Sequence, residues 1–159
     1  MSKKKISQRA NPQRKLPDTV PSYNSIPDSN PGSYYNLHPS WKFSAIDDIC
    51  WTISRDNAFD DFWDIILPKL IGFESQTWAE ILVNSKKQNH SIDVFKLNSI
   101  AQSRLSAKYI EAESIISLRL DGTHRLYGYF VGTDFFILWY DKNHGDNSTC
   151  VCKSTLKYT

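Results

Sequence analysis

From Ser114 onward the hydrophobic pattern has a period of two residues, and this feature constrains the fold more than any other. Apolar and polar residues alternate over 114–120 and 124–131, and a third, almost wholly apolar segment covers 134–140. Asp121-Gly122 and Gly132-Thr133 separate the three segments and are typical of tight turns. The pattern predicts three consecutive antiparallel strands, a β-meander in the C-terminal half of the chain.

The same pattern predicts the register of the first hairpin. A three-residue loop over 121–123 keeps the two faces of the hairpin unmixed, whereas a two-residue loop mixes them. The longer loop pairs Leu118 with Leu126 and Arg119 with Arg125. The apolar face, expected to pack on helices, then holds Ile116, Leu118, Leu120, Leu126 and Phe130. The opposite face holds Ser117, Arg119, Arg125, Tyr127 and Tyr129.

Helical periodicity precedes the strands. Residues 59–71 predict a helix that Pro68 kinks or ends, with an apolar face of Phe59, Phe62, Trp63, Ile66 and Leu70. A short helix is expected near 76–83 with Ser75 as N-cap. The segment 90–97 fits a strand or a helix equally. Ser99 and Gln102 fit a capping box and predict a helix to about Tyr109 that buries Ile100, Ala101 and Leu105.

These elements predict an α+β fold with N-terminal helices packed on one face of the C-terminal antiparallel β-meander. One core is expected to unite the helices and the strands. Its members are Ile116, Leu118, Leu126, Phe130, Trp63, Ile66 and either Ile137 or Leu138.

Composition divides the chain into a tail and one domain. Residues 1–40 hold six of the seven prolines, many Ser and Asn, and few aliphatic residues, so they predict a disordered tail. Residues 1–16 carry six basic residues and no acidic one, whereas the rest carries 13 basic and 17 acidic residues. The tail is either a solubilising segment or an electrostatic arm for nucleic acid. Residues 41–159 are expected to form a single domain.

The location and the cofactor content are predicted by what the sequence lacks. No stretch approaches the roughly 20 apolar residues that cross a bilayer, and no apolar segment follows the basic start. A cytoplasmic protein without a membrane partner is expected. The three cysteines include Cys150-Val-Cys152, a spacing tighter than that of usual zinc sites. The expectation is therefore reduced thiols, with no metal and no cofactor.

The arginine pair is the first candidate for function. Two arginines opposite each other repel unless an anion lies between them, and Tyr127 and Tyr129 on the same face suit base stacking. Arg104 and Lys108 are expected at the rim, and His124 either joins them or points to the other face. The alternative is a structural network in which Arg119 and Arg125 pair with Glu111, Glu113 or Asp134.

Asp141 and His144 directly follow the third strand and are the second candidate. They could form a general acid/base pair, provide half of a metal site, or cap a turn. Lys157 and Tyr158 near the end of the chain could meet the same face.

The stretch from Arg119 to Tyr127, with His124-Arg125-Leu126 at its centre, resembles the RelE/YoeB group of toxin endoribonucleases. The resemblance extends over the apolar strand 135–139 and the Asp/His segment, and covers residues 114–144 closely and 94–144 loosely. It implies a RelE-like fold and metal-free RNA cleavage. By this resemblance Arg125 would stabilise the phosphate in the transition state, helped by Arg119. His144 or Tyr158 would be the acid, and Glu111 or Glu113 the base.

Three functions remain open from the sequence. The first is a RelE-like endoribonuclease acting on RNA, with ribosome-associated mRNA as a substrate and an antitoxin protein as a partner. The second is a non-catalytic module of the same fold that binds a protein or nucleic acid. The third is a metal-dependent phosphodiesterase that uses Asp141, His144 and His90.

Overall fold

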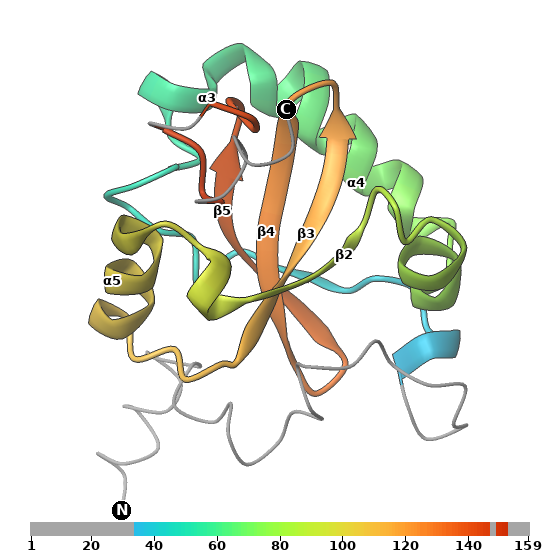
Figure 1. Ribbon diagram of the computed structural model, residues 1–159. Coiled ribbons are helices and arrows are strands. Elements are labelled where there is room, and N and C mark those ends of the chain that lie inside the picture. The colour runs from blue at the N-terminus through green and yellow to red at the C-terminus, as the bar shows by residue number, and fades with distance from the viewer. Residues whose placement is uncertain (1–33, 147–148, 153–159) are drawn as a thin grey trace, which may run out of the picture.

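The computed structural model describes residues 34–146 and 149–152 of the 159-residue chain (Figure 1). The predicted tail lies outside these residues except for 34–40. That segment begins with a 3-10 helix, η2 (Tyr34–Asn36), in which Tyr34 is buried and stacks on Phe130 with 4.0 Å between ring centroids. The described fold thus starts before Trp41, the predicted start, because Tyr34 finds an aromatic partner in the core.

Five strands form one mixed sheet in the order β1-β5-β4-β3-β2. They are β1 (Trp41–Lys42), β2 (His90–Asp93), β3 (Ser114–Asp121), β4 (His124–Val131) and β5 (Asp134–Asp141). The three predicted strands are confirmed as β3, β4 and β5, which pair antiparallel. The prediction of a purely antiparallel meander is wrong, because β1 pairs parallel to β5 and β2 adds a further antiparallel strand beside β3.

The predicted register of the first hairpin is confirmed from Ile116 to Arg119. Leu118 lies opposite Leu126, and Arg119 lies opposite Arg125. The loop is one residue shorter than expected, because Asp121 pairs with His124 and a bulge between Arg119 and Asp121 absorbs the difference. With the bulge, the side chains of both strands still point to the faces of the sheet that the hydrophobic pattern predicts.

The first helix is kinked at Ala58, just before its predicted start at Phe59, and it passes through Pro68 to end three residues later than predicted. It comprises α3 (Arg55–Asp61), the π-helical turn η3 (Phe62–Ile66) and α4 (Leu67–Glu74). In η3 the Leu67 N–H donates to the Phe62 carbonyl. This widened turn directly precedes Pro68, which has no N–H to donate. The extra residue also rotates the helix face, so Phe59 and Trp63 are more than half exposed while Ile66 and Leu70 are buried. The predicted burial of Trp63 is therefore wrong.

The later helices are short, and their N-caps lie one or two residues from the predicted N-caps. Thr77 and Glu80 form a capping box before η4 (Glu80–Asn84), which replaces the predicted cap Ser75. The ambiguous segment divides into β2 and a 3-10 turn, η5 (Val94–Lys96). Asn98 caps α5 (Ser99–Ala107) by accepting from the Ala101 N–H at 2.7 Å. Of the residues expected to be buried in α5, Ile100 is exposed.

The sheet is covered on both faces, so the expected packing of all helices on one face is wrong. One core joins α4 and the η4 segment to Leu118, Leu126, Phe130 and Ile137. A second core joins Ala101 and Leu105 of α5 to the other face, where Tyr127, Tyr129, Leu138 and Trp139 lie. In Figure 1, α3 and α4 cross the top of the view while α5 lies at the left, away from them. None of the helices in the described ranges has the length and apolar character needed to span a bilayer.

Candidate functional site

The two arginines lie side by side at the turn end of the β3–β4 hairpin. The side chain of Arg119 is exposed and that of Arg125 is half-buried. Burial and the nearby Arg119 charge lower the pKa of Arg125. Its guanidinium donates to the carbonyls of Gly122 at 2.7 Å and His124 at 3.1 Å. Among the described residues neither arginine forms an ion pair, so the alternative of a network with Glu111, Glu113 or Asp134 is not observed.

The two tyrosines predicted to stack on bases are not accessible. Tyr127 and Tyr129 are completely buried in the second core, beneath α5 and Val151. The face on which they lie was expected to be open to solvent, and it is closed by residues far away in the sequence. Their assignment to nucleic-acid binding is therefore wrong.

The two basic residues expected at the rim lie on α5 and its end. Arg104 makes a bidentate ion pair with buried Asp47, at 2.9 and 3.0 Å. Asp47 also accepts from Trp139 Nε1 at 2.9 Å, which ties three elements together. Lys108 follows the last residue of α5 and is half-buried. The structure thus gives Arg104 a structural role in place of the predicted contact with nucleic acid.

The acids and bases named from the resemblance are only partly brought together. Glu113 precedes β3, and Arg119 lies six residues further along that extended strand, a separation of about 20 Å. Glu113 is therefore too far from the arginine pair to serve as its base. Tyr158 lies outside the described residues. His124 stacks on Tyr140, with ring centroids 6.0 Å apart, and so points to the first core.

His144 does reach the arginine end of the hairpin. Its backbone N–H donates to the Thr123 carbonyl at 3.1 Å, and the Thr123 hydroxyl donates to the Lys142 carbonyl at 2.8 Å. These bonds hold the loop after β5 against the β3–β4 turn. His90 lies in β2, separated from β5 by two strands, so the set of Asp141, His144 and His90 is not assembled.

Asp141 is buried and organises this end of the sheet. It lies opposite Arg125 in the β4–β5 ladder and is 1% exposed. One carboxylate oxygen accepts from the Asn143 N–H at 2.9 Å, and the other accepts from the Val151 N–H at 2.8 Å. A carboxylate held by two backbone donors is a structural anchor for the segments that carry them.

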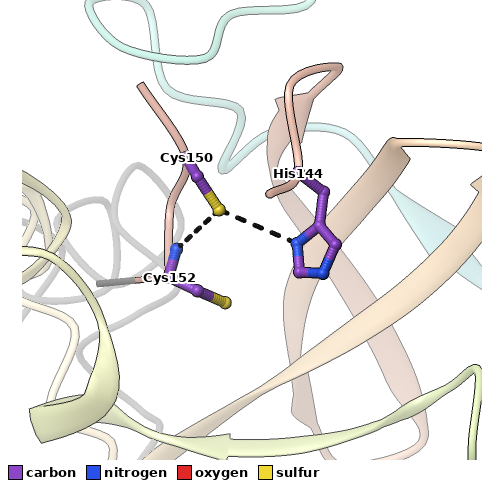
Figure 2. Close-up of side chains that lie close together, drawn as sticks. All are labelled: His144, Cys150 and Cys152. Atoms are coloured by element: carbon purple, nitrogen blue, oxygen red, sulfur yellow. Dashed lines mark hydrogen bonds between the residues drawn. The ribbon is translucent and has the colours of Figure 1, made fainter. Parts of the chain in front are cut away.

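Cys150 and Cys152, which the sequence indicated only as reduced thiols, lie beside His144 (Figure 2). The Cys150 sulfur is 3.7 Å from His144 Nδ1 and accepts from the Cys152 N–H at 3.3 Å. All three cysteines of the chain, Cys50 included, are unpaired thiols. A signal was present in the sequence, because two cysteines separated by one residue share a side of an extended chain.

The two thiols at this site have opposite electrostatic environments. The pKa of Cys152 is lowered to about 7, because its sulfur accepts hydrogen bonds from the Cys150 thiol and from Tyr127 and lies in the field of Arg125. The pKa of Cys150 is raised, since its thiol donates to Cys152 and is buried. The Cys152 sulfur thus carries negative charge more readily than the Cys150 sulfur, although the nearby Asp141 carboxylate opposes this by raising the pKa of both thiols.

No protein-family model, no curated protein and no solved structure matches this chain, so the resemblance to the RelE/YoeB group stays a prediction.

Proposed function

We propose that the chain binds RNA and that Arg119 and Arg125 hold its phosphates. The observation that carries the proposal is the placement of the two arginines opposite each other in the β3–β4 ladder, where neither forms an ion pair among the described residues and buried Asp141 is the neighbour of Arg125 in β5. Such a pair costs free energy in the folded protein, and an anion between the two groups removes that cost. Phosphates of single-stranded RNA fit, because guanidinium groups bind phosphate oxygens in a bidentate manner.

Charge distribution also supports RNA as the anion. The first 16 residues carry six basic side chains and no acid, which adds a sequence-independent attraction for the RNA backbone. The exposed Arg119 is accessible to a polymer, whereas the half-buried Arg125 is held by two carbonyls and is already oriented. Binding therefore requires little side-chain ordering at one of the two contacts.

RNA cleavage is the second candidate, and the position of His144 favours it. Metal-free cleavage needs a cation near the phosphorane, an acid for the leaving 5′-oxygen and a base for the 2′-hydroxyl. The arginines would supply the cation, and His144 at the same turn would supply the acid. This is the endoribonuclease of a RelE-like fold that the sequence resemblance implies, and an antitoxin and ribosome-bound mRNA follow from that resemblance alone. Binding is the better supported function, because Glu113, the base that the resemblance implies, lies about 20 Å along β3 from Arg119.

The experiment compares the full chain with a variant carrying both Arg119→Gln and Arg125→Gln. Fluorescence anisotropy with a labelled single-stranded RNA is expected to show affinity at least about tenfold weaker for the double variant, since each charged contact contributes about 1.5–3 kcal/mol. Arg55→Gln, which removes one exposed arginine on α3, is the control for loss of positive charge elsewhere and should bind like the wild type. Equal affinity of all three proteins would overturn the proposal.

The same samples separate binding from cleavage. After incubation the RNA is resolved on a denaturing gel. Fragments from the wild type that disappear with His144→Ala identify an endoribonuclease, whereas intact RNA in every sample identifies a binding module.

A further inference from the structure

We propose that His144, Cys150 and Cys152 bind one Zn²⁺ ion. This site adjoins the arginine pair, because His144 is held against the β3–β4 turn, but the inference does not depend on RNA binding. Imidazole nitrogen and thiolate sulfur are the donors that zinc prefers in proteins. The sequence analysis predicted no metal site here, because it rested only on the single residue that separates Cys150 from Cys152.

One pair of donor atoms, on Cys150 and His144, already lies at the separation that zinc requires, and the Cys152 sulfur lies close to both. All three lie within 4.8 Å of one another, and Cys150 Sγ is 3.7 Å from His144 Nδ1. A tetrahedral ion at the usual Zn–S and Zn–N bond lengths holds such atoms about 3.6 Å apart. Figure 2 shows the Cys150 sulfur directed at the imidazole, with the Cys152 sulfur beside it.

The two ligand-bearing segments are held by a shared scaffold. Asp141 accepts from Asn143, which precedes His144, and from Val151, which lies between the two cysteines. Asn98 fixes the same segment from the other side, because its N–H donates to the Val151 carbonyl at 2.8 Å and its side-chain amide donates to the Cys150 carbonyl. A buried carboxylate and a helix cap thus position both segments before a metal arrives.

The surroundings of the sulfurs suit bound thiolates. The Cys152 N–H donates to the Cys150 sulfur at 3.3 Å, and the Tyr127 hydroxyl lies 3.5 Å from the Cys152 sulfur. Such donors orient the ligands and stabilise their negative charge. Two thiolates neutralise a divalent ion, so a neutral complex forms when both cysteines release their protons.

The three ligands differ in burial. Cys150 is fully buried, whereas Cys152 and His144 are half-buried among the described residues. No fourth His, Cys, Asp or Glu joins the group among the described residues. A water molecule can therefore occupy the remaining position, as in zinc sites with three protein ligands.

The experiment measures zinc and cobalt binding to the full chain. Reduced protein is dialysed against Zn²⁺ and then against metal-free buffer, and elemental analysis counts the bound ions. One zinc per chain is expected for the wild type and for two matched controls, Cys50→Ser and His90→Ala. Cys150→Ser, Cys152→Ser and His144→Ala should each bind zinc at least about tenfold more weakly in competition with a chromophoric chelator.

Cobalt substitution keeps the proposal testable if the variants do not fold. Co²⁺ added to the reduced wild type should produce the intense near-ultraviolet absorption of sulfur-to-cobalt charge transfer and the visible bands of a tetrahedral ion. Absence of zinc and of these bands in folded wild-type protein would overturn the proposal. Zinc affinity unchanged by the two Cys→Ser substitutions would also overturn it, and so would a Cys150–Cys152 disulfide that persists in reducing buffer.

Discussion

At the scale of single residues, the sequence predicted which side chains face each other better than it predicted which of them are covered. The pairing of Arg119 with Arg125 follows from the hydrophobic pattern, because a slip of one residue would expose the whole apolar face. The burial of Tyr127 cannot be predicted from the pattern, since tyrosine is common both on solvent-exposed sheet faces and in cores. Its cover comes from α5 and Val151, which are distant in the sequence. The His144–Cys150–Cys152 group was also missed, because the path of the chain after β5 brings these residues together and no sequence period reports that path.

Asp47 provides the first prediction at this scale. Burial alone would raise its pKa, but hydrogen bonds from Arg104, Trp139 and the Ile49 N–H outweigh that effect and lower the pKa below its ordinary value. The folded pKa therefore lies below the unfolded one, so the stabilisation is complete above the unfolded value of about 3.9 and is lost as the pH falls below it. Asp47→Asn should reduce the free energy of unfolding by about 2–4 kcal/mol at pH 7.

Urea denaturation at several pH values checks this. The difference between wild type and Asp47→Asn should shrink as the pH falls from about 4 towards 2. Asp48→Asn, next to it and exposed, should remain within about 0.5 kcal/mol of the wild type. A difference that grows on acidification would show that Asp47 is not stabilised as a carboxylate.

At the scale of elements, β3, β4, β5 and the helix around residues 59–71 were predictable because each has a clear period of its own. The continuation of that helix through Pro68 was not, since a π-helical turn adds one residue to the period and rotates the face. β1 could not be predicted from the sequence either. It has only two residues, and it becomes a strand through parallel pairing with β5 near the other end of the domain.

Gly128 supplies the prediction at this scale. It lies in β4 beside a bulge in the pairing with β5, and a Cβ added there would collide with the Phe136 carbonyl oxygen and the Phe135 ring. Gly128→Ala should therefore lower the free energy of unfolding by about 1–3 kcal/mol through overpacking. Chemical denaturation monitored by tryptophan fluorescence measures the change.

Gly72 is the matched control for the same substitution. It lies in α4 with nothing within 4 Å of an added Cβ. Gly72→Ala should raise the free energy of unfolding by about 0.5–1 kcal/mol, because alanine is the better helix former. Equal effects of the two substitutions would mean that the close approach of β5 to Gly128 is wrong.

At the scale of the whole molecule, the α+β class and the C-terminal position of the sheet were predictable from the change of period at Ser114. The burial of both faces of the sheet was not predictable, because α5 is mostly polar and buries only Ala101 and Leu105. This second layer restricts the predicted RNA-binding face to its turn end, where Arg119 and Arg125 remain. We propose that these two arginines hold RNA phosphates.

The dependence of RNA affinity on salt tests that claim most directly. Each phosphate contact releases about 0.7 counterion from single-stranded RNA, so the logarithm of affinity falls against the logarithm of salt concentration with a slope set by the number of contacts. Arg119→Gln should make this slope shallower by about 0.7 relative to the wild type, while Arg55→Gln should leave it unchanged. A slope for Arg119→Gln equal to that of the wild type and of Arg55→Gln would contradict the claim.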